Sequence, residues 1–114
     1  MENPSDRKFE LIAPGIVQLN RQTGRVLFVF EFNEEGRVKG VRAYKKNIVS
    51  GRTMGGFYSE NDKTSTFVSL CKVLTSLREG TEMPKLDGDW VCNSLVFDQI
   101  LQESFEKIAE KFCR

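Results

Sequence analysis

The chain has 114 residues, of which 39% are hydrophobic and 29% are charged, and its net charge is +1. This length fits one domain whose core needs no disulfide or metal to fold, so we predict a single domain over residues 1–114. The near-neutral charge balance excludes a protein that coats nucleic acid by bulk charge, so any polyanion site must be local. The polar residues 1–7 predict a flexible N-terminus.

The chain has three cysteines and no histidine. Cys71, Cys92 and Cys113 are widely spaced and form no C-x-x-C pair, which is not the spacing of a zinc site. Without histidine the chain lacks the commonest general acid–base group and the commonest metal ligand. We therefore expect a non-enzymatic protein with no cofactor and no metal.

We expect no signal peptide, because no apolar run follows a charged N-terminal region, and no apolar run is long enough to cross a bilayer. We expect no membrane contact and a cytoplasmic or nuclear location. A reducing setting of this kind would keep the three thiols free.

The first half of the chain alternates polar and apolar residues, which predicts β-strands. Residues 9–19 predict a first strand with a bend or bulge at Pro14-Gly15. The loops at 20–24 and 33–36 each begin with Asn and end with Gly, a pattern that favours hairpin turns. Residues 25–32, between these loops, predict the central strand.

The central strand carries apolar side chains on both faces. One face would hold Val26, Phe28, Phe30 and Phe32. Leu27 and Val29 would lie on the other face, which must therefore be covered by a helix, a curled sheet or another subunit. This surplus of apolar surface leads us to predict a homodimer.

The next strand, residues 37–46, changes phase. Val38 and Val41 would point to opposite faces of a regular strand. One extra residue, a β-bulge at Gly40, resets the alternation and brings Val38, Val41 and Ala43 to the inner face.

The remaining elements complete an α+β fold. Residues 53–59 predict a fourth strand, weakened or kinked at Gly55-Gly56, and Trp90–Cys92 a short extended piece. Apolar residues then recur at helical spacing over about 64–79 and about 95–113, the second helix being capped by Asn93 or Ser94. We predict a twisted four-stranded antiparallel meander over about 9–59, with these two helices packed on the sheet.

The most informative feature is a run of basic residues at 37–52. This run has a charge of +6 and no acidic residue, which leaves −5 for the rest of the chain. We call its candidate binding residues the basic strip: Arg37, Lys39, Arg42, Tyr44, Lys45, Lys46 and Arg52. If Gly40 is a bulge, the outer face holds Arg37, Lys39, Arg42, Tyr44 and Lys46.

The basic strip leads to our functional hypothesis. Cations along one strand can neutralise successive phosphates, and Tyr44, with Phe57 or Tyr58 on the next strand, can stack bases. We therefore expect a nucleic-acid-binding module with single-stranded nucleic acid as its partner.

Three other interpretations stay open. The strip could be a hydrated face whose lysines discourage edge pairing. The chain could be a protein-interaction adaptor or inhibitor that binds an acidic partner. A small-ligand binder is a third class, with a pocket lined by Phe28, Phe30 and Phe105.

Overall fold

The computed structural model describes residues 8–21, 24–62, 65–82 and 88–112. Six strands form one antiparallel sheet in sequence order. They are β1 (Lys8–Ala13), β2 (Ile16–Arg21), β3 (Gly24–Phe32), β4 (Val38–Lys46), β5 (Thr53–Ser59) and β6 (Gln99–Leu101). A short 3₁₀ turn, η1 (Glu60–Asp62), follows β5. The predicted α+β class is confirmed, with six strands in place of four.

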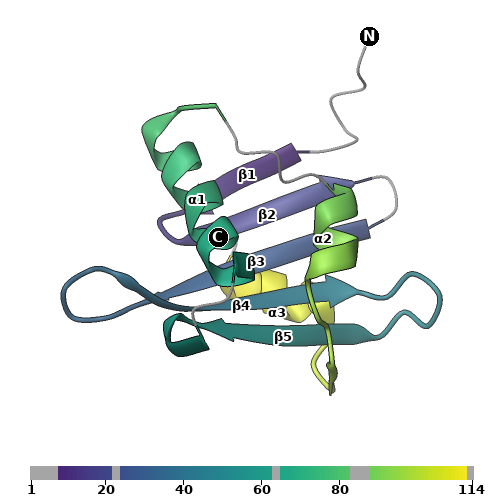
Figure 1. The fold of residues 1–114 in the computed structure, drawn as a ribbon. Helices are drawn as coiled ribbons and strands as arrows, with labels where there is room; N and C mark the ends of the chain where they lie inside the picture. Colours follow the sequence, from purple (N-terminus) through teal and green to yellow (C-terminus); the bar gives the residue numbers. More distant parts are fainter. Residues whose placement is uncertain (1–7, 22–23, 63–64, 83–87, 113–114) are drawn as a thin grey trace, which may run out of the picture.

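Helices lie on both faces of the sheet. In Figure 1, α1 (Ser65–Glu79) and α2 (Gly88–Ser94) lie on the near face, and α3 (Phe105–Phe112) lies behind the sheet. The chain thus forms three layers. The predicted flexible segment 1–7 and Cys113 lie outside the described residues.

The first additional strand arises at Pro14-Gly15, which is a hairpin turn and not a bend within one strand. Gly15 has φ +81°, and the flanking residues Ala13 and Ile16 are paired across the turn. Pro at the first central position with Gly at the second, where φ is positive, matches a type II turn. The carbonyl of Gly15 also accepts the N–H of Phe30 at 2.8 Å, which ties the turn to β3.

The second additional strand, β6, lies inside the region predicted as a helix over 95–113. That prediction is wrong in its first half, because the helix begins only at Phe105. Phe97 packs against the core on the α1 and α2 side, whereas Leu101 packs under α3. A helix packs its apolar stripe against one face of a sheet, so a single helix could not place these two side chains on opposite faces.

The short helix α2 was also missed. It contains Trp90–Cys92, which we had predicted as extended. Asn93 and Ser94 lie in the last turn of α2 and do not cap the start of the following helix.

The sheet separates two cores, and β3 contributes to both. The larger core, toward α1 and α2, is built from Val17, Leu19, Phe28, Phe30, Val41, Ala43, Leu70, Val73, Leu74, Val91 and Leu95. The smaller core, toward α3, is built from Leu27, Val29, Phe105, Ile108 and Ala109. The second face of the central strand is therefore covered by a helix, one of the three covers we expected. The homodimer stays a prediction, but this apolar surface no longer supports it.

The predicted bulge in β4 is confirmed. Glu31 pairs with Gly40 and Phe32 pairs with Val38, so Lys39 is the extra residue. Val38, Val41 and Ala43 consequently all face the larger core. A Cβ on Gly40 would lie 2.8 Å from the ring of Phe57, so the glycine makes room for that ring.

The chain passes from one face of the sheet to the other near β5. A Cβ on Gly56 would lie 2.1 Å from the carbonyl oxygen of Val96. The hydroxyl of Tyr58 accepts the N–H of Val96 at 2.6 Å and so fixes this crossing. The Gly55-Gly56 pair does not interrupt β5. Gly56 instead lets the chain after α2 approach the strand.

Candidate nucleic-acid interface

Strand β4 divides the basic strip between the two faces of the sheet. Tyr44 packs under α3, and Lys46 contacts Glu106 of that helix. Lys45 lies on the opposite face, with Nζ 4.6 Å from the ring centroid of Phe97. Three residues of the predicted outer face, Arg42, Tyr44 and Lys46, therefore lie on the α3 side of β4, and Lys45 does not.

Two cations of the strip are neutralised within the chain. Arg42 forms an ion pair with Glu31 of β3, and this hydrogen bond raises the pKa of Arg42. The ammonium of Lys46 lies 2.8 Å from the carboxylate of Glu106. Both pairs are partly exposed, so water screens them. Their positive charge is only partly available to a ligand.

Apart from Lys45, the remaining cations of the strip are Arg37, Lys39 and Arg52, which are exposed and form no ion pair with any residue that the structure describes. Arg37 and Lys39 lie at one end of β4, where the side-chain oxygen of Asn33 accepts the N–H of Arg37 at 3.0 Å. Arg52 lies beyond the other end, where its carbonyl accepts the N–H of Asn47 at 2.8 Å. A nine-residue strand is roughly 30 Å long. The cations without an ion pair thus lie at the two ends of the strand.

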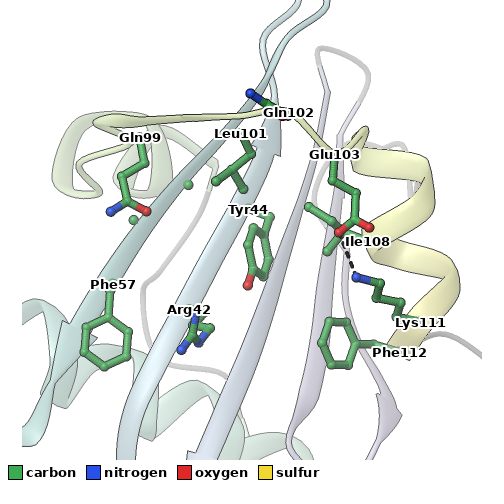
Figure 2. A pocket seen from close by; sticks show the side chains of 12 residues that line it. Arg42, Tyr44, Phe57, Gln99, Leu101, Gln102, Glu103, Ile108, Lys111 and Phe112 are labelled. Carbon is green, nitrogen blue, oxygen red and sulfur yellow. Dashed lines mark hydrogen bonds and ion pairs between the residues drawn. The ribbon is translucent and has the colours of Figure 1, made fainter.

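A cleft of about 340 Å³ opens beside β4, between β5 and β6 on one side and α3 on the other. Figure 2 shows Phe57 and Gln99 on the sheet side, Lys111 and Phe112 on the helix side, and Tyr44 between them.

Phe57 is the most accessible aromatic side chain of this cleft. Its side chain is 53% exposed, and the guanidinium of Arg42 lies 5.6 Å from its ring centroid. A ring held by a cation and open to solvent is a surface on which a planar group can stack.

The helix side of the cleft adds a second cation. The Nζ atom of Lys111 lies 2.9 Å from the carboxylate of Glu103, and Figure 2 draws this contact. The amides of Gln99 and Gln102 add hydrogen-bonding groups at the rim. Aromatic faces with a few polar groups are the lining that a single splayed-out base requires.

Sequence reasoning identified part of this site. Phe57 was named as a stacking candidate together with Tyr58, but only Phe57 lines the cleft, because Tyr58 instead holds Val96. Lys111 and Gln99 were missed. Both lay in the region predicted as one long helix, where no pattern in the sequence relates them to β4.

The aromatic pocket that would support a small-ligand binder, lined by Phe28, Phe30 and Phe105, is absent. Phe28 and Phe30 are buried in the larger core, and Phe105 is buried in the smaller core across the sheet. Because the sheet lies between them, these rings cannot line a common cavity.

Within the described ranges, no three or more His, Cys, Asp or Glu residues are grouped so as to hold a metal ion. No helix in the same ranges is long and apolar enough to cross a membrane. Burial, with Glu60 nearby, raises the pKa of the Cys71 thiol, so this cysteine is less nucleophilic than an exposed one.

Comparison with known proteins gives no match to a family model, to a curated protein or to a solved structure.

Proposed function

We propose that this chain is a non-enzymatic module that binds single-stranded nucleic acid on the α3 side of its sheet. The observation that carries the proposal is the exposed ring of Phe57, held beside Arg42 at the mouth of the cleft. Stacking on an aromatic ring is available to every base, and a neighbouring guanidinium strengthens it.

A single strand fits this surface better than a duplex. The cleft has the volume for one unstacked base, and a duplex keeps its bases inside the helix. Lys39 lies on β4, the strand that carries Arg42, and Arg37 lies just before this strand at the β3–β4 hairpin. Their unpaired charges suit the phosphates on either side of a stacked base.

Affinity should depend on salt to a modest degree. We expect the logarithm of the binding constant to fall with the logarithm of the salt concentration at a slope of about −2. This slope assumes that three unpaired cations each neutralise one phosphate, at roughly 0.7 per phosphate of a single strand. A titration at two salt concentrations measures this slope, and a slope near zero would contradict phosphate contact.

The decisive test is a titration of the full chain with a fluorescently labelled oligothymidylate. Phe57→Ala should weaken binding by about 5- to 150-fold, because loss of base stacking costs about 1–3 kcal/mol. Lys39→Glu should weaken binding most strongly at low salt.

Lys72→Glu is the matched control for charge. Lys72 is exposed on α1, on the other side of the sheet, so this variant should bind as the parent does. Parent-like binding by Phe57→Ala would sink the proposal.

A second candidate is an adaptor or inhibitor that binds an acidic protein. The observation that favours it is the tip of the β4–β5 hairpin, where Ile48 and Val49 are exposed beside Arg52. Apolar side chains contribute to a protein interface but not to phosphate binding. Val49→Asp should therefore abolish binding to a protein partner and leave oligonucleotide affinity unchanged.

Two further expectations belong with this proposal. Binding of nucleic acid accords with the cytoplasmic or nuclear location expected from free thiols. Sedimentation at high micromolar concentration tests the homodimer, and a monomer there would exclude it.

A further inference from the structure

A second site lies at the other end of α3, where two cations face each other across neighbouring strands. Val26 of β3 pairs with Lys45 of β4, so the next pair along this register is Arg25 with Lys46. Like charges placed directly opposite each other destabilise a sheet. Both residues line a surface cavity of about 380 Å³, together with Phe105 and Glu106 of α3.

Arg25 is held in place. Its Nη2 atom donates to the side-chain oxygen of Gln18 at 2.7 Å, and its guanidinium lies 5.3 Å from the ring centroid of Phe105. This cation is therefore preorganised, and an anion that binds it pays little ordering entropy.

Glu106 lines the same cavity as the two cations and pairs with one of them. Its carboxylate is 2.8 Å from Lys46 Nζ. The hydrogen bond from Lys46 lowers the pKa of Glu106, its own backbone N–H in the first turn of α3 adds to this, and Arg25 contributes through its charge. A lysine that donates, a backbone N–H of a first helical turn and a nearby arginine are groups that also hold phosphate.

We propose that Arg25 and Lys46 form a phosphate-binding site, that Glu106 fills it in the free protein, and that a phosphate monoester displaces Glu106. The argument for a monoester is charge balance. Two cations face one another, and a carboxylate or a phosphodiester brings only one negative charge. A terminal phosphate brings about −1.5 to −2 at pH 7.

Displacement of Glu106 leaves no buried charge behind. The side chains of Lys46 and Glu106 are 49% and 56% exposed, so the carboxylate can turn into water. The ligand class is therefore a phosphate monoester, either free or at the phosphorylated end of a strand. The second form rests on the proposed function.

Inorganic phosphate is the direct probe, titrated into the full chain and followed by the NMR amide shifts of Gly24, Arg25 and Lys46. Glu106→Gln removes the competing carboxylate and should tighten phosphate binding by roughly fivefold, the upper range for one exposed ion pair. Adding Lys46→Gln to that variant should abolish binding.

Glu110→Gln is the matched control. It makes the same change on an exposed carboxylate of α3 that lines neither cavity, and it should bind phosphate as the parent does. Equal phosphate affinity for Glu106→Gln and Glu110→Gln, or shifts confined to other residues, would overturn the site.

Oligonucleotides with and without a 5′-phosphate separate the two sources of the ligand. Tighter binding of the phosphorylated form, lost in Lys46→Gln, identifies a strand end as the ligand. Phosphate binding without oligonucleotide binding refutes the proposed function and leaves a site for free phosphate. Oligonucleotide binding that ignores the 5′-phosphate, with no phosphate binding by Glu106→Gln, refutes this site and leaves the proposed function.

Discussion

At the scale of single residues, Gly56 and its neighbour Gly55 have different reasons to lack a side chain. A Cβ on Gly56 would meet the Val96 carbonyl oxygen at 2.1 Å, and a backbone atom cannot turn aside. A Cβ on Gly55 would meet the end of the Leu101 side chain at 3.3 Å and the carbonyl oxygen of Ala43 at 3.7 Å, an ordinary contact distance. The same substitution should therefore have different effects at adjacent positions.

We expect Gly56→Ala to lower the free energy of unfolding by about 3 kcal/mol, the upper part of the range for an overfilled site. Gly55→Ala is the control and should cost under about 1 kcal/mol, because Leu101 can change rotamer. Urea unfolding of both variants measures the difference. Equal losses would mean that the chain does not cross β5 at Gly56.

The hydroxyl group of Tyr58 holds the chain where it crosses β5. The strand pattern in the sequence shows Tyr58 only as an aromatic residue. Its hydroxyl accepts the N–H of Val96, and desolvation raises its pKa because burial disfavours the charged phenolate. Tyr58→Phe leaves that N–H without its acceptor and should cost about 0.5–1.5 kcal/mol in unfolding free energy. Thermal unfolding checks this, and an unchanged midpoint would mean that water replaces the hydroxyl.

At the scale of elements, the extra residue in β4 lets Val38 and Val41 face the same core. Deleting Lys39 removes the bulge but keeps the register, because Val38 and Gly40 would then be consecutive residues opposite Phe32 and Glu31. Val38 would still face the larger core, so we expect the deletion to change the free energy of unfolding by no more than about 1 kcal/mol.

Lys39→Ala is the control for this deletion, because it keeps the backbone and removes only an exposed side chain. It should change stability by no more than about 0.5 kcal/mol. Chemical denaturation compares the two variants, which should unfold at similar denaturant concentrations. A deletion that costs about 1.5–3 kcal/mol more than Lys39→Ala, the value of burying one side chain such as Val38, would show that Lys39 is not the extra residue.

Period-2 patterns predicted the strands well because each side chain in a sheet alternates between faces. The period-3.6 pattern predicted α1 to within one residue, 64–79 against Ser65–Glu79. The same pattern failed over 95–113, because pairing with the edge of β5 outweighed the local helical spacing. Short strands such as β6 are defined by their partner, which one sequence does not reveal.

The candidate site was predictable to a similar degree. Alternation placed Arg42, Tyr44 and Lys46 on one face, and the structure agrees. It could not show that Glu31 and Glu106 neutralise two of these residues, since Glu106 belongs to a helix whose position depends on the crossing at Gly56. Charge in a sequence is visible, but its pairing requires the tertiary structure.

At the scale of the whole molecule, the two cores are unequal, and this bears on the site. The larger core joins β2, β3 and β4 to two helices, whereas the smaller one depends on the eight residues of α3. The cleft and the Arg25–Lys46 pair both use α3 as a wall. The side of the protein that we propose binds ligands is thus the side with the fewest buried contacts.

We therefore expect α3 to open without unfolding of the sheet. In native-state hydrogen exchange, its amides should exchange with a smaller opening free energy than those of β3 or α1. Phe105 is 1% exposed, so Phe105→Ala should lower that opening energy by about 3–5 kcal/mol and remove protection of α3. Protection of α1 should survive, because Phe105 does not contribute to the larger core. If α3 and α1 instead lost protection together in this variant, the two cores would form one cooperative unit, and ligand binding could not use a separate movement of α3.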